Sequence, residues 1–262
     1  MPVPALLREP FLPNAEQPLR LAMWSPPRAR STMTMRVFEA LGCAVYDEPF
    51  YAYWLKATKR EQDPGYAETL AAHETDWQAV AASCLGPVPG GKAVWYQKHM
   101  AIHMLPEVSL AWMASLRHCF LIRDPAEVIC SMREFRGLAG DAEEGARLVG
   151  IPQLERIFDH AWALAGQAPL VIDANDLLAD PPRVLTRVCA ELGLPYDPSE
   201  PLRWAPGKHE GDGAWADAWY QKVFQTTGLA PYTPSPVKVP ASLQSVLDRC
   251  RPVYERMAAH KI

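Results

Sequence analysis

The sequence predicts an α/β protein in which helices flank a central parallel sheet. Three observations lead to this prediction. Short, uniformly apolar runs alternate with longer segments of helical periodicity. Strands that are apolar throughout are typical of parallel sheets, which helices cover on both faces. One apolar run, Leu19–Trp24, leads through a short loop into a helical pattern, an arrangement that can bind an anion.

The expected strands are short apolar runs bounded by polar or turn-forming residues. They cover Leu19–Trp24, Ala93–Gln97, His118–Ile122 and Leu170–Ile172. A fifth, very short strand is expected at Val45–Tyr46. Because strands and helices alternate along the chain, the strands are expected to run parallel in one sheet.

The segments between the strands carry helical patterns, and one more follows the last strand region. The expected helices are Ser31–Leu41, Tyr66–Cys84, Pro106–Ser115, Pro125–Phe135, Leu154–Ala165, Pro181–Leu192, Trp215–Thr226 and Ser242–His260. The proline-rich segment Leu229–Pro240 is expected to be a surface loop. Gly137–Gly150, rich in glycine and acidic residues, is expected to be a mobile lid. No repeat or linker divides the chain, so residues 1–262 are expected to form one domain.

Composition excludes several classes of function. The net charge of −4 argues against a nucleic-acid partner, so any anion site must be a local cluster of basic groups. Met1–Arg20 lacks the apolar core of a signal peptide, and no apolar run is long enough to span a membrane. The six scattered cysteines form no C-x-x-C pair, which favours reduced, buried thiols. We therefore expect a cytoplasmic protein that neither binds a membrane nor contains a zinc site.

The strongest functional signal follows the first strand. Here Arg28 and Arg30 lie in a tight loop, and Ser31 and Thr32 come where the next helix begins. The first amides of a helix have no partner within the helix and point toward a bound anion. The usual G-x-x-x-x-G-K-[ST] signature is absent. The loop therefore predicts a phosphate or sulfate site unlike that of an ordinary ATPase, although Ser31 could also be a plain N-cap.

A second anion signal follows the strand His118–Ile122. Arg123 stands at the carboxyl end of that strand, where open α/β sheets bind ligands. Pro125 suits the first turn of the helix that follows, and Ser131 lies about two turns further along it. Arg123 could alternatively pair with Asp124 or with a neighbouring helix. Together with the first loop, the segment predicts a pair of anion sites on one sheet edge.

This pair of motifs resembles the sulfotransferases that use 3′-phosphoadenosine 5′-phosphosulfate (PAPS). Pro27–Thr32 is similar to their P-R-x-G-[ST]-T loop, and Arg123 with Ser131 is similar to R-[DN]-P followed by a serine eight residues after the arginine. Asn175–Pro182 is similar to the family's E-D-L-x-x-D-P segment and Cys189–Pro195 to its F-L-G-x-P segment, and Gly207–Trp215 looks like a variant of G-x-x-G-x-W. These matches occur in the family's order over most of the chain.

The resemblance implies a P-loop NTPase-like architecture, PAPS as the donor, 3′-phosphoadenosine 5′-phosphate (PAP) as the product nucleotide, and no metal. The residues implied in the cofactor site are Arg28, Ala29, Arg30, Ser31, Thr32, Arg123, Ser131 and Lys208. Of these, Arg28 is also implied to contact the departing oxygen. Arg30 is a departure, since it stands where the family usually has glycine; a group of bacterial members has similar non-glycine loops.

An acceptor hydroxyl or amine needs a group that takes its proton. Glu48, in Val45–Phe50, matches the position of the base in sulfotransferases of the tyrosylprotein and trehalose type. Its neighbour Asp47 is a second carboxylate, and such proximity can raise one of the two pKa values. The alternative is a solvated acidic turn before Pro49.

A second candidate for the base lies at the end of the strand Ala93–Gln97. Lys98 matches the lysine of the K-x-H pattern of cytosolic sulfotransferases, while His99 comes one place early and His103 too late. We expect Lys98 and His99 to face the site and His103 to be structural. The spacing of the two histidines also suits zinc, but no third ligand is evident.

The partner is expected to be a small-molecule acceptor, with a homodimer kept open as the assembly. Aromatic residues of the acceptor pocket are expected among Phe50, Tyr51, Tyr53, Trp54, Trp215, Trp219 and Tyr220, for which a core role is equally compatible. Two competing functions also remain open: a nucleotide-dependent phosphotransferase, and a nucleotide-binding protein without catalysis.

Overall fold

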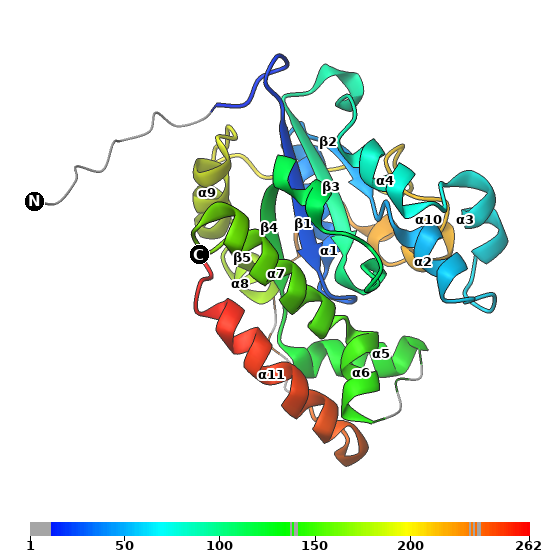
Figure 1. Ribbon diagram of the computed structural model, residues 1–262. Coiled ribbons are helices and arrows are strands. Elements are labelled where there is room, and N and C mark those ends of the chain that lie inside the picture. The colour runs from blue at the N-terminus through cyan, green and yellow to red at the C-terminus, as the bar shows by residue number, and fades with distance from the viewer. Residues whose placement is uncertain (1–11, 137, 139–140, 231, 233, 235–236) are drawn as a thin grey trace, which may run out of the picture.

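The computed structural model describes residues 12–136, 138, 141–230, 232, 234 and 237–262. Its centre is a five-stranded sheet with the strand order β2-β3-β1-β4-β5 (Figure 1). The strands are β1 (Leu19–Ser25), β2 (Ala44–Asp47), β3 (Val94–Met100), β4 (Arg117–Ile122) and β5 (Leu170–Asp173). Every pair is parallel, so the predicted sheet is confirmed together with its short fifth strand.

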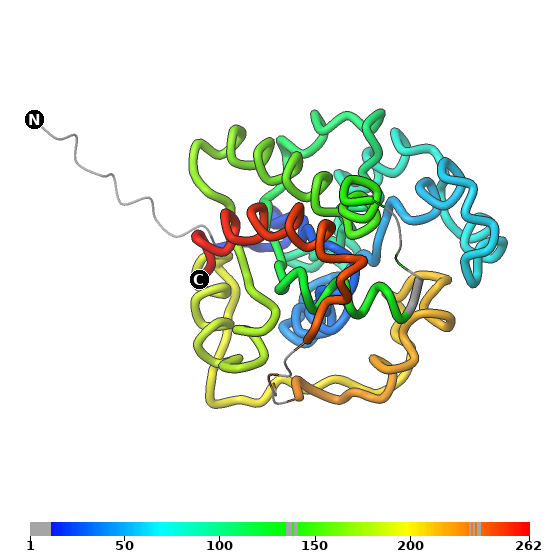
Figure 2. Tube along the Cα trace, turned by 90° about the horizontal axis from the view of Figure 1, so that it is seen from below, coloured from blue at the N-terminus to red at the C-terminus, as the bar shows by residue number. Residues whose placement is uncertain are grey.

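Helices cover both faces of this sheet. They are α1 (Ser31–Ala40), α2 (Tyr51–Ala57), α3 (Tyr66–Ala72), α4 (Trp77–Cys84), α5 (Pro125–Arg136), α6 (Ala142–Val149), α7 (Ile151–Ala165), α8 (Ala174–Ala179), α9 (Pro181–Leu192), α10 (Ala216–Trp219) and α11 (Gln244–Ala258). Helices α1, α8 and α9 pack on one face, and α4, α5, α6, α7 and α11 pack on the other (Figure 2). The strands alternate accordingly, because Leu21 and Met23 join the first core and Ala22 and Trp24 the second.

Strand β3 extends three residues beyond the predicted end at Gln97. Its last residue, Met100, pairs with Ser25 at the end of β1. Lys98 and His99 therefore lie inside the strand, where successive side chains point to opposite faces of the sheet. This extension decides which of the two can reach the site.

Three predicted helices are wrong in extent. Tyr66–Cys84 is divided into α3 and α4, because His73 is extended and the Asp76 side chain caps α4 by accepting a hydrogen bond from the Gln78 N–H. Pro106–Ser115 contains a 3₁₀ turn at Ala111–Ser115 in place of an α-helix. Trp215–Thr226 contains the short helix α10 and a 3₁₀ turn at Val223–Gln225.

The lid expected at Gly137–Gly150 is also wrong where the structure describes it. Residues 142–149 form α6, which is tightly packed on α11: a Cβ on Gly145 would lie within 2.4 Å of a methyl group of Val246. Residues 137, 139 and 140 lie outside the described residues. The described part of the expected loop Leu229–Pro240 contains no helix or strand; residues 231, 233, 235 and 236 lie outside it.

Within the described ranges, no helix combines the length and the apolar character that a membrane crossing requires. All six cysteines are free thiols, and Cys130 is the one that is not buried.

Two histidines are buried beside Trp24 on the face covered by α7. The indole N–H of Trp24 donates to His118 Nδ1 at 3.1 Å, and His118 Nε2 donates to the Met113 carbonyl, so this imidazole is neutral. His99 stacks on Trp24 with 4.4 Å between ring centroids. Burial lowers the pKa of His99 to about 3 and that of His118 to about 4.

We predict that the folded state loses stability as the pH falls below about 6.5. The unfolded histidines bind protons there, whereas the folded ones do so only near pH 4 and 3. The loss approaches about 1.4 kcal/mol per pH unit for each histidine. Urea denaturation between pH 7.5 and 4.5 measures it, and His99→Phe should flatten the slope by up to that amount. A variant with the wild-type slope would show that His99 is not held neutral.

Candidate functional site

The loop between β1 and α1 has an unusual backbone. Arg28 and Arg30 adopt left-handed conformations with φ of 62° and 65°, and Arg30 is the N-cap of α1. The plain N-cap role considered for Ser31 is therefore wrong, because Ser31 is the first helical residue. Arg30 adopts a left-handed conformation that glycine accepts without strain, which accounts for the glycine that the resembling family has at this position.

Backbone strain is concentrated around this region. Among the described residues, four non-glycine residues have positive φ: Arg28, Arg30, Glu48 and Lys59. The first three line one cavity. Left-handed conformations cost energy in such residues and persist where the surrounding structure enforces them, often at functional sites.

The two predicted anion motifs lie against each other. Arg28 Nε donates to the Ser131 hydroxyl at 2.9 Å, and Arg123 donates through one terminal nitrogen to the Arg28 carbonyl at 2.7 Å. The two arginines thus belong to one site at the carboxyl ends of β1 and β4. The connection after β1 leads toward β2 and the connection after β4 leads toward β5, in opposite directions along the sheet, and such a point is the usual ligand position in open α/β sheets.

Glu127 holds the second motif in place. Its Oε2 accepts two hydrogen bonds from Arg123, at 2.8 and 2.6 Å, and lies 3.8 Å from Arg30. Its Oε1 accepts hydrogen bonds from Asn175 and Tyr232. Arg123 therefore pairs with Glu127, whereas Asp124 pairs with Arg251. In the described part of the chain, these bonds and the one to Arg28 engage three of the five N–H groups of Arg123.

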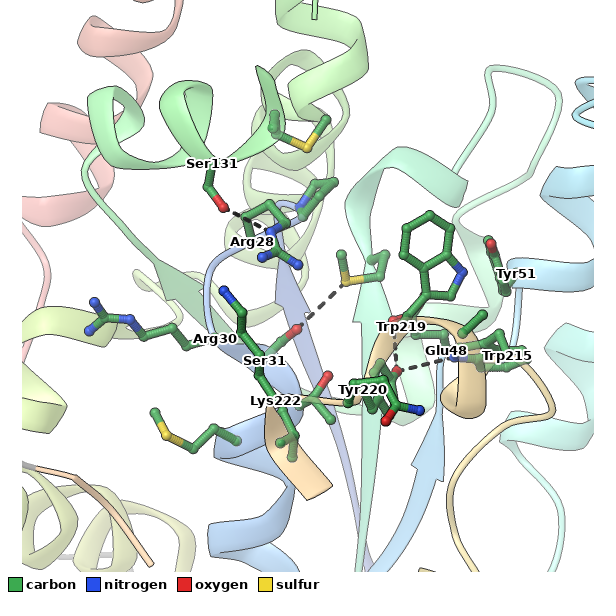
Figure 3. Close-up of a pocket in the computed structure, with 18 of the residues that line it drawn as sticks. Arg28, Arg30, Ser31, Glu48, Tyr51, Ser131, Trp215, Trp219, Tyr220 and Lys222 are labelled. Carbon is green, nitrogen blue, oxygen red and sulfur yellow. Dashed lines mark hydrogen bonds between the residues drawn. The ribbon is translucent and has the colours of Figure 1, made fainter. Parts of the chain in front are cut away.

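A cavity of about 760 Å³ opens between the anion loop and the C-terminal segment, within the range of small-molecule sites. Its basic side carries Arg28, Arg30, Arg123 and Lys222, with Ser31, Thr32 and Ser131 beside them. Its other side carries Glu48 and the rings of Tyr51, Trp215 and Trp219 (Figure 3). The site thus joins an anion-binding half to an aromatic half that contains one carboxylate.

Glu48 is the carboxylate of the aromatic half. Its Oε1 accepts a hydrogen bond from the Tyr220 hydroxyl at 3.1 Å and lies 2.9 Å from Lys98 Nζ. Its Oε2 is 3.8 Å from His103 Nε2. The alternative of a solvated acidic turn is wrong, since the side chain of Glu48 is only 12 % exposed.

Lys98 is fully buried directly behind the cavity. Its ammonium group donates to Asp47 at 2.8 Å, Thr32 at 2.9 Å and Tyr220 at 2.6 Å. Burial alone would lower the pKa of Lys98, but the carboxylates of Asp47 and Glu48 outweigh burial and raise it. Lys98 therefore remains charged and connects the anion loop, through Thr32, to Glu48.

His99 does not reach the cavity, which corrects its assignment as a candidate base. Because β3 continues through Met100, Lys98 and His99 point to opposite faces, and His99 stacks on Trp24 and bonds to Gln97 Oε1. His103, expected to be structural, lines the cavity beside Glu48. Zinc ligation by the pair is not supported: in the described residues, no group of three or more His, Cys, Asp or Glu side chains could hold a metal.

Lys208 also lies away from the lining. It is partly exposed and forms an ion pair with Asp217 at 2.5 Å. Lys222 reaches the basic side of the cavity from the segment after α10 (Figure 3). Ala29, within the anion loop, is buried in the core on the α1 face and is not among the described residues that line the cavity.

The aromatic runs divide between the cavity and the core. Tyr51, Trp215, Trp219 and Tyr220 line the cavity. Phe50, Tyr53 and Trp54 are buried in the core cluster on the α7 face of the sheet. Tyr53 donates to Glu107 at 2.8 Å, away from the cavity.

Comparisons with known proteins identify the family of the chain. Residues 19–261 match a family model described as a sulfotransferase domain. Two proteins of Arabidopsis thaliana are similar: branched-chain-amino-acid aminotransferase-like protein 1, 31% identical over 93% of this chain, and protein 2, 29% identical over 90%. The chain spans only 42% and 41% of the length of these relatives.

Two solved structures are similar to the chain as well. They are the sulfotransferase domain of the Synechococcus PCC 7002 olefin synthase and the sulfotransferase domain of the curacin biosynthetic pathway. Each is 16% identical, with TM-scores of 0.47 and 0.46. The matches cover 94% and 92% of this chain, and 95% and 98% of the respective structures.

Proposed function

We propose that this chain, which belongs to the sulfotransferase domain family, transfers a sulfuryl group from PAPS to a hydroxyl or amine of a small-molecule acceptor. The observation that carries the proposal is that Arg28, Arg123 and Glu48 line one cavity. Two guanidinium groups suit a nucleotide that carries phosphates at two positions, and a carboxylate nearby suits an acceptor that loses a proton.

The residues around the cavity fit such a donor. Arg28, Ser31, Thr32 and the first amides of α1 would hold the 5′-phosphosulfate, because a helix N-terminus favours negative charge. Arg123 and Ser131 would hold the 3′-phosphate, with Lys222 in the role that the sequence had suggested for Lys208. Burial and the neighbouring Arg123 lower the pKa of Arg30, consistent with a density of positive charge that an anion would relieve.

In the proposed reaction, PAPS supplies the sulfuryl group and PAP leaves. The acceptor oxygen or nitrogen forms a bond to sulfur, and the bond between sulfur and the oxygen of the 5′-phosphate breaks. The acceptor proton passes to Oε2 of Glu48, since Oε1 is held by Lys98 and Tyr220. Arg28 and the α1 amides neutralise the charge that develops on the departing phosphate.

A melting-temperature screen with PAP, AMP, ATP and sulfate tests the donor site. PAP at ~100 times its dissociation constant should add about 2.7 kcal/mol of stability. For a protein of this size, that corresponds to a rise of roughly 5–10 °C in melting temperature. A shift with ATP and none with PAP would overturn the proposal in favour of a phosphotransferase.

We predict that Arg123→Ala weakens PAP binding by about 10- to 100-fold, the cost of losing hydrogen bonds to a charged group. AMP lacks the 3′-phosphate, so its weaker binding should stay unchanged. Calorimetric titration of both nucleotides measures the difference. Arg251→Ala is the matched control, because Arg251 pairs with Asp124 outside the cavity. An equal loss for PAP and AMP would exclude Arg123 from the 3′-phosphate site.

Transfer itself is tested with labelled sulfate from PAPS and a panel of alcohols, phenols and amines. Product on any acceptor supports the proposal. PAP binding without transfer across the panel would favour a nucleotide-binding protein without catalysis.

A further inference from the structure

The Tyr220 hydroxyl lies at the centre of the buried polar cluster behind Glu48. Lys98 Nζ donates to it at 2.6 Å and the Trp215 indole N–H at 3.1 Å. The hydroxyl is 2.9 and 3.0 Å from the two oxygens of Asp47 and 3.1 Å from Glu48 Oε1. From these contacts, and resting on the proposed function, we infer that Tyr220 is a positioning residue that orients Glu48 to accept the acceptor proton.

Counting donors and acceptors limits where the hydroxyl proton can go. A tyrosine oxygen has one hydrogen and accepts up to two hydrogen bonds. Lys98 and Trp215 occupy the accepting positions. The Thr32 hydroxyl, also a partner of Tyr220, has a hydrogen of its own to donate, whereas the carboxylates can only accept, so the single hydrogen of Tyr220 points to Asp47 or Glu48. Burial and the two carboxylates hold the pKa of Tyr220 well above its usual value, so the hydroxyl keeps this hydrogen.

The two carboxylates differ in the number of hydrogen bonds that they accept from groups other than Tyr220. Asp47 Oδ1 accepts from Lys98, and Oδ2 accepts from the Gly213 N–H. Asp47 is buried, whereas Glu48 lines the cavity. When Glu48 is ionised, the Tyr220 hydroxyl donates to its Oε1 and leaves Oε2 toward the acceptor. Once Glu48 has taken the proton, the hydroxyl turns to Asp47, so every carboxylate keeps a donor in both protonation states.

The position of Tyr220 in the chain adds a second consequence. Tyr220 directly follows α10, and the same short segment brings Trp219 and Lys222 to the cavity (Figure 3). Its hydroxyl fastens this segment to the ends of β2 and β3 through Asp47 and Lys98. The Tyr220 side chain thus orients the proposed base, Glu48, and also anchors the segment that brings Lys222 to the cavity.

Tyr220→Phe tests the inference, because it removes the hydroxyl and keeps the ring. We expect kcat to fall about 10- to 100-fold, while KM for PAPS stays within about twofold. The acid limb of the kcat–pH profile should move to higher pH, since the ionised base has lost a donor. Tyr53→Phe is the matched control: it also removes a hydroxyl bonded to a carboxylate, but outside the cavity, and should leave both readouts unchanged.

A second substitution separates positioning from a structural role. Replacing Tyr220 with 3-fluorotyrosine keeps the shape and strengthens the donor, so the acid limb should move to lower pH. If Tyr220 acts through Glu48, the double variant Tyr220→Phe/Glu48→Gln should be no slower than Glu48→Gln alone.

Three outcomes would overturn the inference and leave the proposed function intact. They are losses of kcat that add in the double variant, an acid limb that does not move in either Tyr220 variant, and loss of the folded state in Tyr220→Phe. A wild-type chain that binds PAP but transfers no sulfuryl group would overturn both. The wild-type assay therefore distinguishes the two failures.

Discussion

Glu48→Gln is expected to lower kcat by about 10²- to 10⁴-fold, the range over which a general base contributes. The amide keeps the size of the side chain, and its oxygen can still accept from Tyr220 and lie beside Lys98 at the Oε1 position. It cannot take a proton from an acceptor hydroxyl. The loss should therefore appear in kcat, while PAP, bound on the other side of the cavity, keeps its affinity.

Single-turnover transfer of labelled sulfate, combined with PAP titration, measures both quantities. Glu107→Gln is the matched control, because Glu107 also accepts a hydrogen bond from a tyrosine but lies outside the cavity. Full activity in Glu48→Gln would remove Glu48 from the role of base. His103 would then be the next candidate, since it lines the same part of the cavity, 3.8 Å from Glu48 Oε2.

The sheet and its ligand edge could be predicted from local patterns. Apolar runs such as Leu19–Trp24 indicate strands from local sequence alone. The order of strand, loop and helix then places Arg28 and Arg123 at the carboxyl ends of two strands without knowledge of the packing. What local patterns could not specify was the length of β3. Three more residues of pairing with β1, up to Met100 opposite Ser25, put Lys98 and His99 on opposite faces of the sheet and remove His99 from the site.

The short helices were missed for a related reason. Helix α2 has only seven residues and α8 only six. Segments this short are stable through packing rather than through their own propensity, so the sequence gives them little periodic signal. The aromatic run before Lys56 was compatible with either a pocket wall or the core, and it serves both: Tyr51 lines the cavity, whereas Phe50, Tyr53 and Trp54 are buried in the core.

The contacts of Tyr220 with the carboxylates and the presence of Lys222 in the site depend on long-range packing, which the sequence did not predict. Tyr220 and Lys222 follow β2 by more than 170 residues, yet Tyr220 bonds to Asp47 and Glu48. Their aromatic and basic character gave a weak signal, which the nearby Lys208 shared. Alternation along β3 places Lys98 on the face covered by α1, where it donates to Thr32 in the first turn of that helix.

Lys98→Met is expected to destabilise the folded state by about 3–5 kcal/mol, the usual cost of removing one partner from a buried ion pair. Methionine nearly preserves the shape of the side chain. It leaves the buried carboxylate of Asp47 and the mostly buried carboxylate of Glu48 without the cation that lies 2.8 and 2.9 Å away. At roughly 2–4 °C per kcal/mol, the melting temperature should fall by about 6–20 °C.

The pH dependence identifies the cause of this loss. Without Lys98, the folded state should favour a protonated carboxylate more than the unfolded chain does, so it binds more protons and gains stability relative to wild type as the pH falls. The difference in the free energy of unfolding between the variant and wild type, measured by urea denaturation, should therefore become smaller from pH 8 to pH 5.5. Adding Asp47→Asn removes one buried charge and should recover part of the stability at pH 8. If this difference in unfolding free energy is constant with pH, and the double variant recovers no stability, Lys98 contributes through packing and its charge does not stabilise the two carboxylates.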